Sequence, residues 1–373
     1  MRFIHLSDLH IGKRVNEFSM LEDQKYILNQ ILDIIDDERP DAVFLAGDIY
    51  DKSVPPTEAV ELLDDFLYRL AQRDTEVFII SGNHDSADRL AFASRLIEHS
   101  GVHISRVYNG TVARYTVEGA DIYLLPFIKP AHVRRFYEDK KIGSYTDAMR
   151  TVIDDLDLDQ SKRNILITHQ FVTGSVRTES EDISVGGADN VDAEVFAPFD
   201  YVALGHIHRP QNCGSERIRY CGTPLKYSIS EVSDQKSVTV GELDADGKLT
   251  IRTVPLVPLR GMVELRGSYD ELTSKQFYDG TTYREDYVRI TLTDEEDIPD
   301  AVGKLRTIYK NLMKLDYDNQ RTRSGGSLLP DAQAQTKSPT ELFGDFFTAQ
   351  NGRPMSETQQ EYIQSMIESV WEG

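Results

Sequence analysis

Five short apolar segments, each followed at once by polar residues of the kind that bind metal ions, constrain the fold of this chain most. The segments are rich in Val, Ile, Phe and Leu, and they occupy residues 3–6, 42–45, 77–80, 165–168 and 201–204. Apolar runs of this length predict buried β-strands. Two stretches between them, 21–37 and 57–73, carry apolar side chains at helical spacing instead. Strands that alternate with helices predict a layered α/β fold.

The polar residues after these segments form five motifs. They read Asp8-x-His10, Gly47-Asp48, Gly82-Asn83-His84-Asp85, Thr168-His169 and Gly205-His206-x-His208. Because ligands bind outside the carboxyl ends of the strands in such sheets, we expect these side chains to meet in one site. Asp, Asn and Gly are also common in ordinary turns, which would account for a single motif. Five motifs in succession favour a functional site.

The residue types in these motifs predict a site for two divalent ions. Imidazole nitrogens mixed with carboxylate and amide oxygens suit Mn, Fe or Zn, whereas Mg prefers oxygen. Two neighbouring ions need a shared ligand, and Asp48, at the end of a central strand, is the best candidate. We assign one ion to Asp8, His10, Asp48 and His208, and the other to Asp48, Asn83, His169 and His206. If the two outer motifs continue their strands, Asp8 and His10 share one face, as do His206 and His208.

The charge balance of this site predicts a phosphate ester as substrate. Two divalent ions outweigh two carboxylates, so the pocket keeps a positive charge that attracts phosphate. Two ions can activate a water molecule and clamp the phosphoryl oxygens during in-line attack. His84, beside Asn83, is the candidate general acid for the leaving oxygen. We expect the Asp51 carboxylate to accept a hydrogen bond from the other ring nitrogen of His84.

The residues outside the motifs predict no second site. His5, His99, His103 and His132 are expected to be structural or surface residues. Cys213 and Cys221 bracket a predicted hairpin and fit a reduced cytoplasmic protein better than a zinc site. Without an apolar stretch long enough to cross a membrane, and with Met1 leading straight into the first strand, we expect no membrane association.

Read together, the motifs resemble the calcineurin-like metallophosphoesterase superfamily. Three longer phrases are similar to the SbcD family, the nuclease subunits of bacterial SbcCD complexes. These phrases are Ser184-Val185-Gly186-Gly187 and residues 202–211 and 220–228. Protein phosphatases of the superfamily carry Asp-Arg-Gly after the second motif. This chain has Asp51-Lys52-Ser53 there, which argues against that branch.

The resemblance implies a four-layer metallophosphoesterase β-sandwich flanked by helices, with a small α+β capping domain and a C-terminal helix pair. It implies a Mn-dependent DNA nuclease of repair and recombination that degrades duplex ends from 3′ to 5′, cuts single strands and opens hairpins. The ligand roles above carry over residue by residue, and His84 matches the family's catalytic histidine, with Asp51 as its partner. The implied partners are an SbcC-type coiled-coil ATPase, DNA ends and hairpins, and a second copy in a homodimer. The implied location is cytoplasmic and nucleoid-associated.

The acidity of the chain opposes DNA binding at long range. Its 62 acidic and 41 basic residues give a net charge of −21, which repels a duplex. Local basic residues lessen the conflict: Lys13, Arg14, Lys129, Arg134, Arg135, Lys140, Lys141 and Arg209. Each of these is more often a solvated charge than a DNA contact. Much of the DNA affinity is therefore expected to come from a partner protein.

Composition changes along the chain predict four segments. Residues 1–258 hold the nuclease domain, 261–320 form the capping domain, 321–339 form a polar linker, and 340–373 form a helix pair. In the capping domain we expect a strand at 287–292 and a helix from Ile298 to about Leu312. That domain either helps to recognise DNA ends or merely packs against the nuclease domain.

Two capping boxes and a glycine stop predict the terminal helix pair. The boxes lie at Ser338 to Glu341 and at Ser356 to Gln359, and Gly352 ends the first helix. The apolar residues of the pair are Leu342, Phe343, Phe346, Phe347, Tyr362, Ile363, Met366, Ile367, Val370 and Trp371. They exceed what two short helices can bury between themselves. Packing onto the nuclease body is one outcome, and the linker favours docking to another protein. The resemblance implies that this protein is the SbcC-type ATPase.

Two other functions stay open from the sequence. A phosphatase or phosphodiesterase for small molecules would need neither the capping domain nor the helix pair. A non-catalytic scaffold would have lost metal ligands, and each motif keeps its own.

Overall fold

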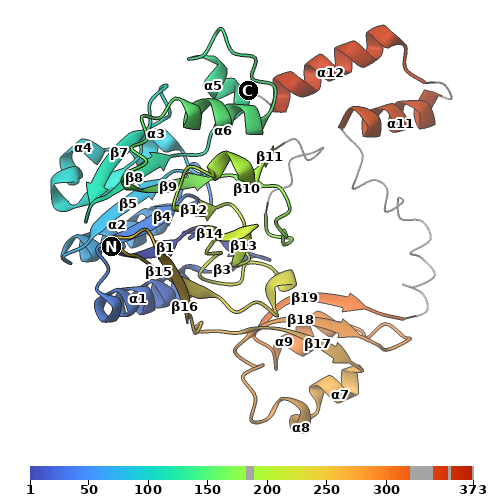
Figure 1. The fold of residues 1–373 in the computed structure, drawn as a ribbon. Helices are drawn as coiled ribbons and strands as arrows, with labels where there is room; N and C mark the ends of the chain where they lie inside the picture. Colours follow the sequence, from blue (N-terminus) through green and yellow to red (C-terminus); the bar gives the residue numbers. More distant parts are fainter. Residues whose placement is uncertain (182–188, 320–338, 352–353, 372–373) are drawn as a thin grey trace. The chain divides into compact units, whose positions relative to one another are not determined.

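The computed structural model describes residues 1–181, 189–319, 339–351 and 354–371 (Figure 1). The chain forms two compact units. The first comprises Met1–Glu181 and Asn190–Asn319, and the second comprises Asp182–Asp189 and Gln320–Gly373. The residues of the predicted site lie in the first unit, as do most of the residues predicted as the nuclease domain (1–258) and the capping domain (261–320).

Two six-stranded sheets form the body of the first unit. The first has the order β16 (Leu249–Pro255), β15 (Ser237–Leu243), β1 (Arg2–Leu6), β4 (Ala42–Ala46), β5 (Glu76–Ile80), β6 (Val102–Ile104). The second has the order β13 (Gln211–Cys213), β14 (Ser215–Tyr220), β12 (Tyr201–Gly205), β9 (Arg163–His169), β8 (Ala120–Leu125), β7 (Ala113–Val117). The central strands run parallel in each sheet, so their carboxyl ends share one edge.

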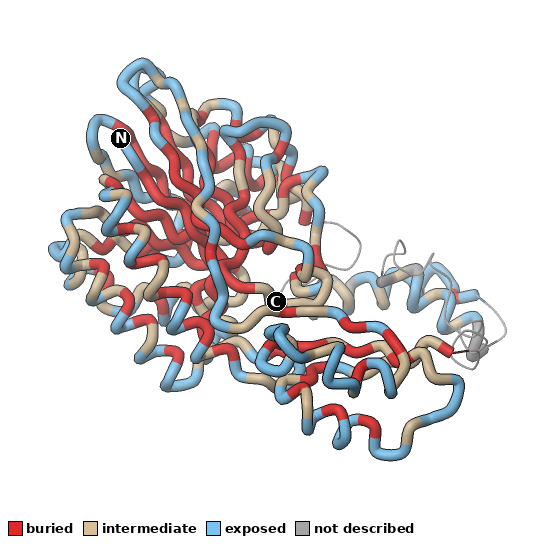
Figure 2. Tube along the Cα trace, turned by 90° about the horizontal axis from the view of Figure 1, so that it is seen from below, coloured by how far each residue is buried: buried red, intermediate tan, exposed pale blue. Residues whose placement is uncertain are grey.

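The sheets pack face to face around an apolar layer. Phe3 and Phe44 of the first sheet meet Tyr201 of the second, with 4.7 Å between the ring centroids of Phe3 and Tyr201. Because the outer faces are covered as well, the central strands are buried on both sides and read as unbroken apolar runs. Figure 2 shows these buried strands as the red centre of the body.

Helices cover the outer face of each sheet. The apolar stripes of α1 (Leu21–Glu38) and α2 (Thr57–Ala71) pack on the first sheet. Those of α5 (Pro130–Arg134) and α6 (Tyr145–Asp154) pack on the second. The four-layer sandwich predicted for this chain is thereby confirmed, and each predicted strand lies within one residue or two of its observed bounds.

Shorter elements connect these layers. They are β2 (Arg14–Val15), β3 (Phe18–Ser19), α3 (Ala87–Leu90), α4 (Ser94–Ile97), β10 (Phe171–Val172) and β11 (Asn190–Val191), with 3₁₀ turns at Glu98–Ser100, Ala193–Phe196 and Ile229–Glu231.

A three-stranded parallel sheet forms the core of the region predicted as a capping domain. Its strands are β17 (Met262–Gly267), β18 (Tyr287–Leu292) and β19 (Asn311–Tyr317), accompanied by α7 (Tyr269–Thr273), α8 (Lys275–Tyr278) and α9 (Ala301–Arg306). Asp23 of α1 joins this region to the body, since it pairs with Arg260 at 2.6 Å and accepts a hydrogen bond from the Tyr287 hydroxyl at 2.8 Å.

The predicted helix from Ile298 to about Leu312 is wrong. The helix is α9, which ends at Arg306, and β19 begins at Asn311. Residues 307–309 are threonine, isoleucine and tyrosine, which lose side-chain freedom in a helix. As a strand, the following segment pairs with β18 and buries Leu312 in the core of the small sheet.

The described residues of the second unit include the helices α11 (Pro339–Asn351) and α12 (Glu357–Trp371). The Thr340 hydroxyl donates to the Gln364 side chain at 2.8 Å, which links the two helices. The capping box predicted at Ser356 is confirmed, because its backbone N–H donates to the Gln359 side chain and its hydroxyl accepts from the Gln359 N–H. Ser338, Gly352 and nearly all of the predicted linker lie outside the described residues.

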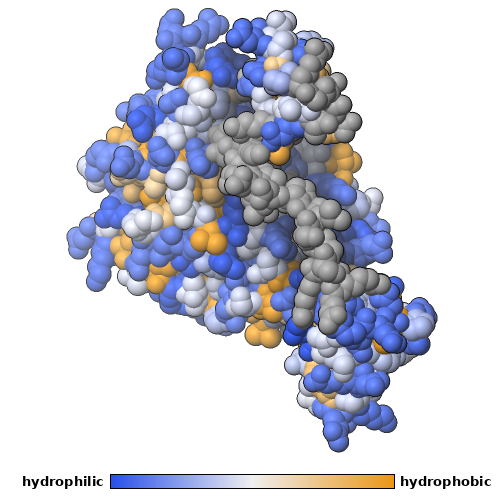
Figure 3. Space-filling model, turned by 90° about the vertical axis from the view of Figure 1, so that its right-hand side faces the viewer, coloured by the Kyte–Doolittle hydropathy of each residue, from blue (hydrophilic) through white to orange (hydrophobic). Residues whose placement is uncertain are grey.

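Polar side chains dominate the surface that Figure 3 presents, with hydrophobic groups scattered among them. No described helix is both long enough and apolar enough to cross a membrane.

Candidate metal centre

Left-handed turns follow the strands that carry the motifs. The φ angles are positive at Asp8 (53°), His10 (45°), Asp48 (49°) and His206 (102°). Asp8-x-His10 and His206-x-His208 therefore do not continue their strands, since β1 ends at Leu6 and β12 ends at Gly205. Turning the chain out of the sheet aims the side chains at a common point. Such conformations persist only where surrounding bonds enforce them.

Hydrogen bonds between the loops enforce these conformations. The Asp8 N–H donates to the Gly47 carbonyl and the His10 N–H donates to the Asp48 carbonyl, each at 3.0 Å. The His206 N–H, from the other sheet, donates to an Asp8 carboxylate oxygen at 3.0 Å. The motif loops thus hold one another in place.

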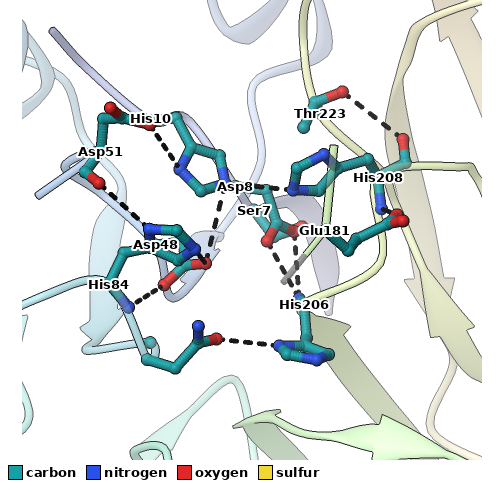
Figure 4. Close-up of polar contacts among 12 residues, drawn as sticks. Ser7, Asp8, His10, Asp48, Asp51, His84, Glu181, His206, His208 and Thr223 are labelled. Carbon is teal, nitrogen blue, oxygen red and sulfur yellow. Dashed lines mark hydrogen bonds and ion pairs between the residues drawn. The ribbon is translucent and has the colours of Figure 1, made fainter. Parts of the chain in front are cut away.

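Asp48 lies at the centre of the site (Figure 4). Its Oδ2 atom is 3.4 Å from His169 Nε2, 3.7 Å from His10 Nε2 and 3.9 Å from His84 Nε2. Ligand atoms of Asp8, Asp48 and His169 also converge, as do those of Asp8, His10 and His208. A carboxylate in this position can contact ions on both of its sides.

Two sets of donors flank Asp48. On one side, His10 Nε2 lies 3.1 Å from His208 Nε2, with Asp8 in the same cluster. On the other side, Asn83 Oδ1 lies 2.8 Å from His206 Nδ1 and 3.0 Å from His169 Nε2. The structure brings together the seven residues predicted as metal ligands, with Asp8 close to donors of both groups. Their division between two ions stays a prediction.

The outer hydrogen bonds of the imidazoles leave lone pairs facing the centre. His169 Nδ1 donates to the Ala46 carbonyl at 2.8 Å, so its Nε2 faces Asp48 and Asn83. His208 Nδ1 donates to the Ser180 hydroxyl at 2.5 Å. An imidazole whose far N–H is bound in this way is oriented for a metal ion.

Burial keeps three of the imidazoles neutral. It lowers the pKa of His206 to about 3 and holds the pKa values of His10 and His208 well below the ordinary value. For His169, burial acts in the same direction, but the neighbouring Asp48 carboxylate outweighs it and raises the pKa to about 9. A divalent ion would provide the same positive charge and would require the unprotonated nitrogen.

The pKa values of the two carboxylates, Asp8 and Asp48, are shifted in opposite directions. Burial raises the pKa of Asp8 to about 7. Burial also disfavours the charged form of Asp48, but the adjacent histidines, His169 first, outweigh it and hold that pKa well below its ordinary value. The carboxylate at the centre is therefore charged.

This donor set fits divalent metal ions. His10 Nε2 and His208 Nε2 lie 3.1 Å apart and both rings are held neutral, so the two nitrogens could bind one divalent ion once neither of them carries a proton. Neutral imidazoles with two carboxylates and one amide oxygen match the borderline ions predicted from the sequence.

The predicted contact between the Asp51 carboxylate and His84 is wrong. His84 Nδ1 donates to the backbone carbonyl of Asp51 at 3.0 Å, while the carboxylate accepts from Lys13 Nζ at 2.7 Å and lies 3.6 Å from His10 Nδ1. The loop after β4 brings the carbonyl, rather than the side chain, to His84.

Sequence reasoning missed a buried hydrogen-bonded chain behind His208. The Ser180 hydroxyl, which accepts from His208, donates to Glu231 at 2.6 Å. Glu231 pairs with Lys236 at 2.5 Å, and Lys236 donates to the His208 carbonyl at 2.8 Å. Both charges are almost fully buried. No local pattern in the sequence predicts a pair whose members support a histidine more than twenty residues away.

A second missed residue, Asp85, was visible in the third motif but had no assigned role. Its carboxylate accepts hydrogen bonds from the N–H groups of Ile49, Tyr50 and Gly82. It therefore ties the loop that carries Asp48 to the loop that carries Asn83. Burial raises its pKa to about 6.

The remaining histidines and cysteines lie elsewhere. His5 is buried between the sheets, 2.9 Å from the Tyr201 hydroxyl, and His103 stacks on Phe78. Cys213 and Cys221 are both free thiols, and each contacts a different serine.

The fold and donor set define a metal-dependent phosphodiester hydrolase of the calcineurin-like class. The family model Calcineurin-like phosphoesterase matches residues 1–210, and the model Type 5 capsule protein repressor C-terminal domain matches residues 258–351. Two relatives, from Staphylococcus epidermidis and Staphylococcus saprophyticus, are each named as the D subunit of the nuclease SbcCD and are 30% identical over 377 residues. The alignments cover 99% and 100% of this chain and 99% of each relative. The chain belongs to the SbcD family of nuclease subunits.

Among solved structures, a dimetal phosphatase from Danio rerio is similar at a TM-score of 0.44 and 12% identity, covering 69% of this chain and 96% of that chain. A likeness at this level supports no further inference.

Proposed function

We propose that this protein is a Mn-dependent DNA nuclease. The observation that carries the proposal is the convergence of three histidine nitrogens on Asp48 Oδ2, with a separate donor group on each side. One ion is assigned to Asp8, His10, Asp48 and His208, and the other to Asp48, Asn83, His169 and His206. Bound there, the ions would supply Lewis acidity that activates water and neutralises charge on the phosphoryl oxygens.

His84 is proposed as the general acid. Its Nδ1 is fixed by the Asp51 carbonyl, which leaves Nε2 directed toward Asp48 at 3.9 Å. The carbonyl accepts only from a protonated Nδ1, so Nε2 is the nitrogen that would carry the catalytic proton. A proton delivered from Nε2 to the departing sugar oxygen would complete cleavage of the phosphodiester.

DNA is proposed as the substrate because the relatives that match the entire chain are named as nucleases of the SbcCD type. The expected activities are 3′ to 5′ degradation of duplex ends, cutting of single strands and opening of hairpins. The region 261–320 is proposed to help to position DNA ends.

Two protein contacts are proposed. The helix pair, residues 340–373 beyond the 321–339 linker, would bind a coiled-coil ATPase of the SbcC type. Several of its apolar side chains are exposed: Leu342, Phe343, Phe346, Tyr362 and Met366. A homodimer would use the outer layer of the body, where Val60 and Tyr68 of α2, and Phe92 and Leu96 near α4, are exposed. Sedimentation of the purified chain would test the dimer.

The substrate proposal is tested with the purified chain in Mn. End-labelled duplex, hairpin DNA and a phosphomonoester are compared at equal protein concentration. Cleavage of both DNA substrates supports the nuclease, with a ladder from the 3′ end supporting the polarity. Cleavage of the phosphomonoester alone would instead indicate a small-molecule phosphatase, and bound Mn without turnover would indicate a scaffold.

A further inference from the structure

Arg177 lies over the face of an aromatic ring beside the metal centre. Its guanidinium carbon is 3.6 Å from the centroid of the Phe171 ring, and that ring centroid is 6.4 Å from the His206 ring. A guanidinium stacked in this way has its face on the ring and its N–H groups at the edge, where they can reach a ligand.

The backbone on both sides of Arg177 is pinned. Val176 exchanges two hydrogen bonds with the Gln211 side chain, at 2.9 Å and 2.8 Å. On the other side, the Thr178 N–H donates to Glu181, and the second oxygen of that carboxylate accepts from the His208 N–H at 2.7 Å. Arg177 is therefore held close to two predicted ligands: Phe171 lies beside His206, and Glu181 binds the backbone of His208.

Other cationic side chains near the centre differ from Arg177 in their surroundings or in their chemistry. Lys13, on the His10 side, is already paired with Asp51 at 2.7 Å, and Arg209 is paired with Asp234 at 3.0 Å. The sequence also lacks the arginine that phosphatases of this superfamily carry after the second motif, since Lys52 and Ser53 stand there. A planar guanidinium binds two oxygens of one phosphate, which a lysine does not do.

We propose that Arg177, presented by the Phe171 ring, binds non-bridging oxygens of the substrate phosphate on the His206 side of the metal centre. This inference rests on the proposed phosphodiester hydrolysis and deepens it. Arg177 replaces, from a different loop, the phosphate-binding arginine that the second motif lacks.

Calorimetric titration of inorganic phosphate into the Mn-loaded full chain tests the proposal. Arg177→Gln is expected to weaken phosphate binding roughly tenfold to a hundredfold, the range for a lost charge-assisted hydrogen bond. Arg177→Lys should recover part of the affinity through charge alone, and Phe171→Leu should lose part of it because the stacking ring is gone. Arg217→Gln, at an exposed position on β14, is the matched control and should bind phosphate like the parent.

A separate titration with Mn alone distinguishes binding from structural damage. The Mn affinity of Arg177→Gln should equal that of the parent chain. Unchanged phosphate affinity in Arg177→Gln, or an equal loss of Mn affinity, would overturn the proposal. DNA cleavage by the same variants is measured in parallel: a raised KM supports the assignment, whereas a parent chain that leaves DNA intact defeats the proposed function while the phosphate titration still judges Arg177.

Discussion

His84 is oriented by a peptide carbonyl, and a carbonyl cannot be removed by side-chain mutation. The Asp51 side chain instead faces Lys13 and His10. Substitution of Asp51 would therefore alter the surroundings of His10 and leave the hydrogen bond to His84 in place. The proposed general acid and the proposed metal site can thus be examined separately.

Replacement His84→Gln is expected to lower the single-turnover rate of DNA cleavage by about 10² to 10⁴-fold, because the proton donor is lost. The Mn affinity, measured by calorimetry, should stay within about twofold of the parent. His99→Gln, at an exposed position, serves as control and should cleave normally. A cleavage rate that survives in His84→Gln would remove this residue from the mechanism.

Removal of one charge of the buried pair should destabilise the fold. Glu231→Gln leaves Lys236 buried without its carboxylate, and breaking such a pair costs about 3–5 kcal/mol. The free energy of unfolding is measured by urea denaturation, with Glu231→Gln/Lys236→Met as the matched double variant. The double variant should be more stable than the single one, and equal stabilities would show that the pair is not the cause.

The seven donors could be predicted from the sequence because each follows an apolar run directly, and the fold then brings the strand ends together. Ser180, Glu231 and Lys236 could not, since their importance arises from burial and from contacts to His208. The orientation of the Asp51 loop also escaped prediction. Spacing along the chain does not reveal whether a side chain or a carbonyl reaches a neighbour.

At the scale of elements, the strands were predictable and the turns after them were not. A run of apolar residues predicts a buried strand. The left-handed turn at Asp8 or His10 depends instead on hydrogen bonds to a neighbouring loop, which the sequence does not reveal. The error at residues 307–312 has a similar origin. That segment has helical spacing, but pairing with β18 buries it as a strand.

The close approach of the two sheets depends on Gly205 at the end of β12. A Cβ added there would lie 1.9 Å from the Ala46 carbonyl oxygen and 2.6 Å from His169 Nδ1. Gly205→Ala is expected to lower the free energy of unfolding by about 3 kcal/mol or more and to weaken Mn binding by roughly tenfold.

Gly143→Ala is the control for this substitution, because its Cβ would meet nothing closer than 3.7 Å. It should change the free energy of unfolding by less than about 1 kcal/mol. Urea denaturation and Mn titration are measured for both variants. If Gly205→Ala unfolds and binds Mn like the parent, the sheets can move apart there without loss of stability or of metal affinity.

At the scale of the whole molecule, the net charge of −21 contrasts with a phosphate substrate. The metal ions and Arg177 would act over short distances, after another surface has brought the DNA close. Repulsion from the remainder of the chain would weaken DNA binding by the unassisted protein, and most strongly at low salt.

The partner proposal is tested by Phe346→Ser/Tyr362→Ser, which changes two exposed side chains, 60% and 65% accessible, in the helix pair. Affinity for an SbcC-type ATPase should fall by at least about tenfold, because large aromatic residues contribute much of the binding energy in helix docking. Val257→Ser, at an exposed position outside the helix pair and outside the proposed dimer surface, is the control for general loss of apolar surface. Unaltered affinity in the double variant would show that this face of the helix pair does not bind the ATPase.

The strand β1 lies between β4 and β15, so the first strand of the chain is flanked by one that starts at Ser237. The proposed ligands also divide between the sheets, with His169, His206 and His208 on the later one. During synthesis, a ribosome-bound chain that ends before His206 lacks part of both proposed ion sites, and the first sheet is incomplete until β15 has emerged. A chain that is still being made would therefore hold neither ion in its full set of ligands.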